Sequence, residues 1–394
     1  MDSGICISDL EMVTPLGPDA DHSCAAFRAG ILRVGELKNF SFLDKEMFGG
    51  PIQGHAIAFL PPGFIGPAKA LLMGCHVLKR LLQKGPHLRQ GKDKTGMFLN
   101  LSDYILPDRK YRMEKAFEAE LERQFGEDDD PAHPPISMET VLPSSAWKGQ
   151  HQGLLTKLLE MCDFVLPGAH QHLYFGGHTG VVHAIHDAAE AIRLGKYDRG
   201  IVGAIDSCIE PPVLEAGAIT GILKTQKNPV GFIPGEAAGF LVLEKQQDAA
   251  RRGNRTLLEI SSLALEKEKF DRFSEDIPLG KALFRTLDQI IYSGTRSGDK
   301  VGFILGDLNG DVYRANDWGH ALVRLNAKYP VGDLPMWLPA VGFGETGAAT
   351  GVLSLGLMDA AFKKEECKKM PAALLWLSSE TGEHGGILVK FSKS

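Results

Sequence analysis

Two short turns in the sequence place a chemically active side chain inside the pattern Gly-x-Thr-Gly. Residues 176–186 read GGHTGVVHAIH, with His178 in the turn, and residues 343–353 read FGETGAATGVL, with Glu345 in the equivalent place. A histidine held by a carboxylate is a pair that enzymes use for general base catalysis. If the two turns face one another, a hydrogen bond between His178 and Glu345 closes the space between them, and this bond suits either a base or a structural lock.

Three further patterns have less chemical content. The segment GFGETG at 342–347 fits the dinucleotide fingerprint, but no acidic residue ends the next strand about 20 residues on, as that fingerprint requires. Cys208 follows a predicted strand and is expected to be a small buried thiol. Five histidines lie close in sequence but come from different elements without supporting Cys or carboxylate spacing, so we expect no metal. These five are His170, His172, His178, His183 and His186.

Each turn stands between a strand pattern and a helix rich in small residues. Short apolar runs bounded by Gly or Pro alternate with longer helical patterns, which is typical of an α/β fold. The predicted strands are 4–9, 95–101, 172–176, 200–204, 239–244, 256–265, 301–305, 336–341, 372–377 and 386–391. The predicted helices are 67–83, 109–125, 151–161, 179–194, 279–293, 312–326 and 346–362.

The repeated turn predicts a chain built from two similar halves. With 394 residues the chain exceeds the size at which one hydrophobic core stops growing. The polar stretch QQDAARRGNRT near residue 250 is interpreted as a helix-poor join, which gives halves at 1–247 and 256–394. The first half carries an insertion at about 100–170, within which the acidic, proline-rich segment 125–137 is expected to form a mobile surface loop.

The composition is that of an ordinary globular protein. The chain has 44% hydrophobic and 23% charged residues and a formal charge of -6, so no basic footprint for nucleic acid is present. The six cysteines form no Cys-x-x-Cys pair, which favours reduced intracellular thiols over a disulfide framework or a zinc site. Because neither a signal peptide nor a membrane-spanning apolar run is visible, we expect a cytoplasmic protein with no membrane or nucleic-acid partner, no metal and no cofactor.

Four segments in both halves carry a resemblance to a known family. They are VTPLG at 13–17, HAIHDAAEAIRLGKYDRGIVGAIDS at 183–207, GFIPGEAAGFLVLEK at 231–245 and GETGAATG at 344–351. In these segments the chain resembles the β-ketoacyl synthases of the thiolase-like superfamily. The resemblance implies a thiolase-like fold, with two similar βαβαβαββ halves in a five-layered αβαβα body, usually as a homodimer. It also implies a site where two central helices meet at their N-termini.

The same resemblance implies that the catalytic side chains of the family are missing. It places His178 at the position of the nucleophilic cysteine, Asn309 at the first catalytic histidine, Gly344 at the second and Pro339 at the lysine. The segment ETGEH at 380–384 stands in place of the glycine-rich gatekeeper loop. A thiolate and two donors are needed for the condensation, so this pattern implies a catalytically degenerate ketosynthase.

The leading functional prediction is a non-catalytic ketosynthase-like scaffold or adaptor. The chain is similar to degenerate thiolase-like proteins encoded among bacterial type VI secretion effector genes, which implies a role in effector loading. The partner would then be an effector, a chaperone or a component of the secretion spike. Two alternatives stay open. One is an acyltransferase or decarboxylase that uses His178, Glu345 and Asn309, and the other is a silent acyl-binding partner of an active ketosynthase, with acyl-carrier protein as a further partner.

Overall fold

The architecture of most of the chain is given by a computed structural model. It describes residues 4–40, 48–61, 63–90, 94–102, 144–253, 256–272, 274, 277–294, 300–363 and 372–391. The helix predicted at 109–125 and the loop predicted at 125–137 lie outside the described residues.

Ten strands form one continuous sheet that contains the same arrangement twice. One group has the order β1-β7-β6-β4-β5 and the other has the order β8-β12-β11-β9-β10. In each group the first two pairings are antiparallel and the next two are parallel, and β1 pairs with β8 to join the groups. The strands are β1 (Ile5–Val13), β4 (Thr95–Leu101), β5 (Gln171–Tyr174), β6 (Arg199–Ser207), β7 (Glu236–Lys245), β8 (Leu258–Lys267), β9 (Val301–Leu305), β10 (Met336–Trp337), β11 (Ala372–Ser378) and β12 (Glu383–Lys390).

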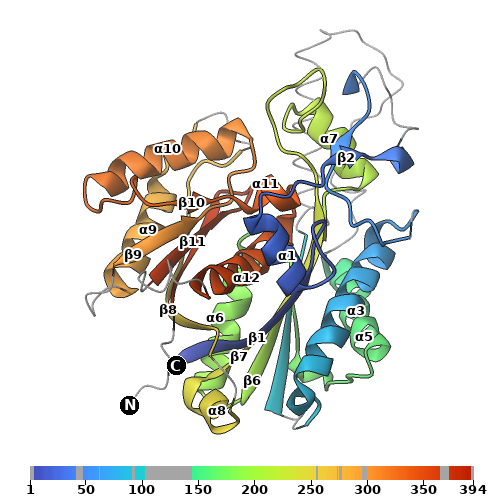
Figure 1. Ribbon diagram of the computed structural model, residues 1–394, viewed down its shortest axis with the longest axis vertical. Helices are drawn as coiled ribbons and strands as arrows, with labels where there is room; N and C mark the ends of the chain where they lie inside the picture. The colour runs from blue at the N-terminus through green and yellow to red at the C-terminus, as the bar shows by residue number, and fades with distance from the viewer. Residues whose placement is uncertain are drawn as a thin grey trace.

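Two central helices lie between the strand groups. Helix α6 (Gly180–Arg193) contacts β6 and β7 as well as β8 and β12, and α12 (Thr350–Phe362) contacts β1, β7 and β11. Every residue of α12 is buried, which explains its small and apolar sequence. A side chain at Gly351 would collide with Val181, so glycine there permits the two helices to pack closely. The sheet therefore bends around this helix pair (Figure 1).

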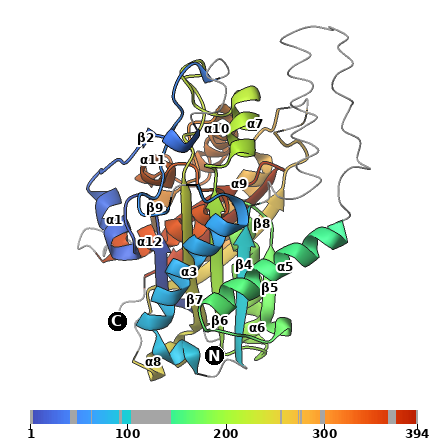
Figure 2. The same cartoon turned by 90° about the vertical axis from the view of Figure 1, so that its right-hand side faces the viewer.

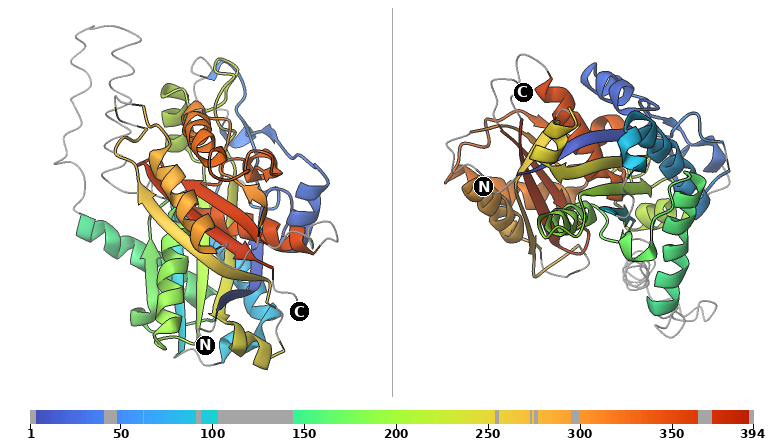
Figure 3. Two further views of the ribbon diagram at one scale, coloured as in Figure 1. Left: turned by 90° about the vertical axis from the view of Figure 1, so that its left-hand side faces the viewer. Right: turned by 90° about the horizontal axis from the view of Figure 1, so that it is seen from below.

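Outer helices cover the two remaining faces. Helices α3 (Gly66–Lys84) and α5 (Ser144–Met161) pack together, and α3 lies on β1 and β7 (Figure 2). Helices α9 (Lys281–Gly294) and α10 (Val312–Asn326) pack together on the opposite side, where α9 lies on β8 and β12 (Figure 3). The predicted five-layered α/β fold is confirmed. None of the described helices combines the length and apolar character needed to cross a membrane.

Several predicted bounds differ from the structure by a few residues, such as β1, which continues to Val13, and α5, which begins at Ser144. Two differences have identifiable reasons. The strand predicted at 336–341 ends at Trp337, because Pro339 begins the short helix α11 (Pro339–Phe343), where proline suits the first helical position. The stretch near residue 250, predicted to be helix-poor, contains α8 (Gln246–Arg251), in which Arg251 pairs with Asp248 three residues earlier.

Several short elements were not predicted, because each is too short to show a clear apolar period. The helix that begins at Ala20 does have a start signal in the sequence, because Asp19 is a favourable N-cap residue and accepts a hydrogen bond from the His22 amide. These elements are α1 (Ala20–Arg28), α7 (Pro211–Ile219), β2 (Gly35–Glu36), β3 (Gln53–Gly54), η1 (Lys38–Phe40), η2 (Pro86–Arg89) and η5 (Gly168–His170). The helix predicted at 346–362 begins with the 3-10 turn η6 (Gly347–Ala349) before α12.

Candidate functional site

The two Gly-x-Thr-Gly turns meet at the N-terminal ends of the central helices. The first turn leads from β5 into α6, and the second leads from α11 through η6 into α12. The buried amide of Asn100, at the end of β4, ties them together by donating to the carbonyl oxygens of Gly177 (2.8 Å) and Ala348 (3.3 Å). The turns therefore face one another, which is the condition set by the sequence analysis for a hydrogen bond between His178 and Glu345.

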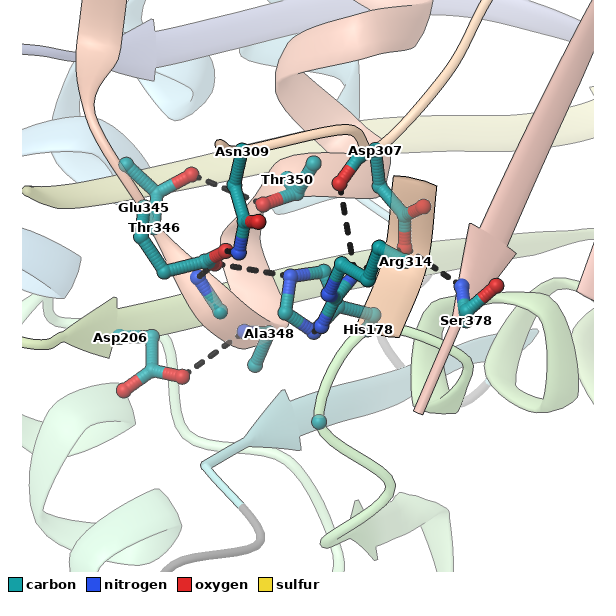
Figure 4. Close-up of polar contacts among 12 residues, drawn as sticks. His178, Asp206, Asp307, Asn309, Arg314, Glu345, Thr346, Ala348, Thr350 and Ser378 are labelled. Carbon is teal, nitrogen blue, oxygen red and sulfur yellow. Dashed lines mark hydrogen bonds and ion pairs between the residues drawn. The ribbon is translucent and has the colours of Figure 1, made fainter. Parts of the chain in front are cut away.

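His178 lies between a carboxylate and a guanidinium group. Its Nε2 is 2.8 Å from Oε1 of Glu345, so the predicted hydrogen bond is present (Figure 4). Its Nδ1 is 3.2 Å from Nη2 of Arg314. A guanidinium group only donates and an ionised carboxylate only accepts. In the neutral imidazole, Nδ1 would therefore accept from Arg314 and Nε2 would donate to Glu345, so both ring nitrogens are engaged.

Glu345 accepts hydrogen bonds from three sides. Besides His178, Oε1 accepts from the backbone amide of Gly347 (2.7 Å), and Oε2 accepts from the side-chain amide of Asn309 (2.5 Å). Only 5% of Glu345 is exposed, and burial alone would raise the pKa of its carboxyl group. His178, Arg314 and Asn309 outweigh burial and lower this pKa to about 2, so Glu345 is ionised in the folded protein.

Arg314 of α10 joins His178 to a buried network of acids. It donates to Oδ2 of Asp307 at 2.5 Å and to Oε1 of Glu380 at 2.7 Å, and only 2% of Arg314 is exposed. Although burial disfavours the cation, Asp307 and Glu380 keep the pKa of Arg314 well above its usual value. Arg272 extends the network by bonding both Glu380 and Asp311. The site is thus held by the buried guanidinium group of Arg314 and the partly exposed one of Arg272.

Asp206, at the end of β6, caps the second turn. Its Oδ2 accepts from the amide of Ala348 at 2.8 Å, and Gly347 leaves room for this approach because a side chain there would collide with the carboxylate. Burial raises the pKa of Asp206 to about 6, although hydrogen bonds from the Ala348 and Ser207 amides oppose the rise. Asp206 therefore holds η6 against the end of the sheet.

Little free space remains between the two turns. The cavity bounded by His178, Asp206, Asn309, Glu345 and Arg272 holds about 10 Å³, which is room for one water molecule. Sites for small molecules usually offer several hundred Å³. On the other side of Asp206 a second, mostly apolar cavity of about 310 Å³ opens. Its lining includes Pro67, Ala70, Met73, Leu101, Leu154 and Ile205.

The structure brings together three of the five positions singled out from the sequence. His178, Asn309 and Glu345 are joined by hydrogen bonds, as described above. Pro339 begins α11, and Gly344 ends it with a φ of 75°, so neither brings a polar side chain to the site. The roles of all five as former catalytic positions stay predictions.

The other candidate motifs do not converge on this site. His183 contacts Glu383 and His172 contacts Tyr197, and within the described residues no group of three or more His, Cys, Asp or Glu side chains is arranged to hold a metal. The segment 342–347 begins inside α11 rather than directly after a strand. Cys208 is buried as predicted, and burial raises the pKa of its thiol well above the usual value.

Sequence reasoning missed the charged residues around His178. Arg314 lies in a segment interpreted only as a helix, Asp307 lies two residues before Asn309 in a segment interpreted only for that position, and Glu380 was noticed only as part of the segment that replaces a glycine-rich loop. The only signal in the sequence was that several acidic residues and arginines lie close to the apolar strand segments. Without the fold, such charged residues cannot be distinguished from those of a solvated surface.

Part of the chain matches a known family. Residues 179–249 match the family model of the β-ketoacyl synthase N-terminal domain. Nodulation protein E of Rhizobium leguminosarum bv. trifolii is 30% identical over 110 residues, which are 26% of this chain and 27% of that protein. A putative polyketide β-ketoacyl synthase 1 of Streptomyces virginiae is 30% identical over 105 residues, covering 24% of this chain. The alignments span about a quarter of the length of these two relatives.

Solved structures extend the likeness to the whole chain. A type II polyketide ketosynthase, solved with its acyl-carrier protein, superposes with a TM-score of 0.75 at 16% identity and covers 100% of both chains. This chain has the ketosynthase fold. The ishigamide ketosynthase/chain length factor gives a TM-score of 0.67 at 13% identity. The superposition covers 98% of this chain and 99% of the ishigamide chain. The thiolase-like architecture expected from the sequence is therefore confirmed.

Proposed function

We propose that this ketosynthase-like chain is catalytically inactive and acts by binding other proteins. The observation that carries the proposal is that both ring nitrogens of His178 are engaged, Nδ1 by Arg314 and Nε2 by Glu345. A histidine in this state has no free nitrogen with which to take a proton from a substrate or attack an acyl group. Cys208 borders the same site, but its raised pKa keeps it a thiol rather than a reactive thiolate.

The space at the site supports the same proposal. An acyl chain does not fit in about 10 Å³ beside His178, and Arg272 and Glu380 border this small cavity. Opening it would separate Arg272 and Arg314 from buried carboxylates, which is costly. The residues at the two turns therefore serve to close the old site.

Acyl transfer tests the proposal directly. Incubating the wild-type chain with acyl-CoA or acylated carrier protein should leave its intact mass unchanged and yield no condensed or decarboxylated product, because the site offers no free nucleophile. An active ketosynthase in the same assay is the positive control. An acyl adduct or a product, lost on replacing His178→Ala and Glu345→Gln, contradicts the proposal and supports the acyltransferase or decarboxylase alternative.

The partner is expected to be a protein. Two of the structural neighbours are a ketosynthase in complex with its acyl-carrier protein and a ketosynthase/chain length factor. A chain with their fold but a closed site fits a scaffold or adaptor role. We further propose that this partner is an effector, a chaperone or a component of a type VI secretion spike. This assignment is based on the sequence resemblance alone.

A silent acyl-binding partner of an active ketosynthase is a second candidate function. The observation that favours it is the apolar cavity of about 310 Å³, which is large enough for a small ligand. Asp206 separates this cavity from His178, so an acyl chain bound there would not meet the histidine. In the same incubation, native mass spectrometry distinguishes this function, since a non-covalent acyl complex would form without any product.

An open sheet edge supports the proposed homodimer. Strand β5 ends the first strand group and pairs only with β4 among the described residues, so its outer edge presents unpaired backbone groups. Two copies that pair along β5 would continue the sheet across a two-fold axis, which is a common way to cover such an edge. The chain is therefore proposed to form a homodimer through β5.

Hydrogen exchange and solution mass test this interface. At micromolar concentration the chain should have twice the monomer mass, and the amides of β5 should exchange slowly because a partner covers them. Dilution to monomers should speed their exchange roughly tenfold or more, whereas β10, the edge strand at the opposite end of the sheet, should not respond. A monomer mass together with concentration-independent exchange in β5 contradicts the proposal.

A further inference from the structure

Two cysteines that are far apart in the sequence lie in contact beneath the outer helices. Cys75 lies within α3, and Cys162 directly follows α5, yet their Sγ atoms are 3.6 Å apart. This pair could not be recognised from the sequence, because the two residues have no close spacing and belong to different helical segments. The five cysteines in the described residues all have free thiols, and all are buried.

The end of α5 holds Cys162 in this position. The amide of Phe164 donates to the carbonyl of Leu159, and Asp163 adopts a φ of 51°, so the helix closes in a left-handed turn that glycine favours and that aspartate tolerates better than most residues. Arg89 fixes the turn from outside by donating to the carbonyl oxygens of Cys162 (3.3 Å) and Asp163 (2.9 Å). The backbone of this turn therefore presents Cys162 to α3.

The geometry points to a reversible disulfide between Cys75 and Cys162 that forms when the protein meets a peroxide. The two sulfurs need to approach by only about 1.5 Å to reach the length of a disulfide bond. Both residues are held by helices that already pack together, so little backbone movement is required. This inference is independent of the proposed function.

The two thiols have different roles in the reaction. Cys75 is 8% exposed and Cys162 is 0% exposed, so Cys75 is the one that a peroxide reaches. Its sulfur takes one oxygen atom from the peroxide to give a sulfenic acid and releases one water. The sulfur of Cys162 then attacks the sulfenic sulfur, the S–S bond forms, and the hydroxyl leaves with the proton of Cys162 as a second water.

The environment of Cys162 keeps it from being oxidised first. Burial and the neighbouring Cys75 raise the pKa of the Cys162 thiol to about 12, so it stays protonated and does not react with peroxide. Once Cys75 carries the electrophilic sulfur, the contact between the two sulfurs lets Cys162 attack while its proton passes to the departing hydroxyl. In balance, two thiols and one peroxide give one disulfide and two waters.

The bond would join two helices that border the apolar cavity of about 310 Å³. Helix α3 contributes Pro67, Ala70 and Met73 to the lining of this cavity, and α5 contributes Leu154. A covalent link between α3 and the end of α5 would fix the separation of these walls. The oxidation state of the pair is thereby coupled to the shape of the apolar cavity.

Thiol counting with linkage mapping tests the inference on the full chain. After treatment with hydrogen peroxide, two of the six cysteines should no longer react with an alkylating reagent under denaturing conditions. The intact mass should fall by the mass of two hydrogen atoms. Proteolysis should yield one cross-linked peptide pair that contains Cys75 and Cys162, and dithiothreitol should restore all six thiols. Six alkylated thiols, or a linkage between any other pair, overturns the inference.

Variants separate the pair from general oxidation. Cys162→Ser should abolish the cross-link and leave Cys75 as a sulfenic acid that a dimedone probe labels. Cys24→Ser is the matched control, because Cys24 is also buried with a pKa raised to about 12 and its Sγ lies 3.5 Å from the carbonyl oxygen of Gly356 rather than beside another thiol. That control should form the cross-link at the wild-type rate. The wild-type linkage map decides the question even where a variant does not fold.

Discussion

Replacing Arg314→Met should lower the free energy of unfolding by about 3–5 kcal/mol, the cost of removing one partner from a buried ion pair. Arg314 lies almost wholly inside the protein, and its loss leaves the carboxylate of Asp307 without its cation and Glu380 with Arg272 alone. It also removes the donor that Nδ1 of His178 accepts from. Equilibrium unfolding in guanidinium chloride measures the change.

A surface pair provides the matched control for Arg314. Arg193→Met removes an arginine that pairs with Glu190 at 2.7 Å, but both side chains are more than 40% exposed, so a loss of at most about 1 kcal/mol is expected. Adding Asp307→Asn to Arg314→Met should recover part of the larger loss, because the buried carboxylate no longer lacks a cation. A loss below about 1 kcal/mol in the single variant shows that the network does not hold the site.

Most strands and helices could be predicted from apolar runs bounded by Gly, Pro or polar residues and from helical apolar periods. The strands at 95–101 and 301–305 and the helix at 312–326 have the predicted bounds. The two-residue strands β2 and β3 are too short to show a period, and the nine residues of α7 are mostly apolar without a distinct polar face. The proposed boundaries of the halves at 247 and 256 stay predictions, although the strand order repeats on either side of them.

The contact between His178 and Glu345 could be predicted because both residues occupy the same place in a repeated turn. An internal repeat brings equivalent turns together when the helices that follow them meet end to end. Arg314 offered no such signal, because its partners stand 7, 66 and 136 residues away in the sequence. An arginine within a helix is interpreted by default as a surface residue, and only the packed fold shows that α10 turns this one inward.

Replacing Glu345→Gln should remove a contribution to stability that depends on pH. The pKa of Glu345 is lowered from an ordinary 4.5 to about 2 in the folded protein, so folding favours its ionised form. The contribution is therefore fully present above about pH 4.5 and is lost as the pH falls through 2. A shift of this size corresponds to about 3 kcal/mol at neutral pH. Glutamine would also place an amide donor opposite the side-chain amide of Asn309, which is itself a donor, so that hydrogen bond would be lost.

The free energy of unfolding, measured for both chains between pH 2 and pH 7, tests this dependence. The difference between wild type and Glu345→Gln should be about 3 kcal/mol at pH 7 and should shrink steadily below pH 4.5, because the wild-type carboxylate is then protonated. Glu190→Gln, at an exposed position paired with Arg193, should show a small difference at every pH. A difference that stays constant down to about pH 2 would mean that the glutamine variant is destabilised for reasons of shape rather than charge. In that case the carboxylate does not hold His178 by its charge, and the closed site depends on packing alone.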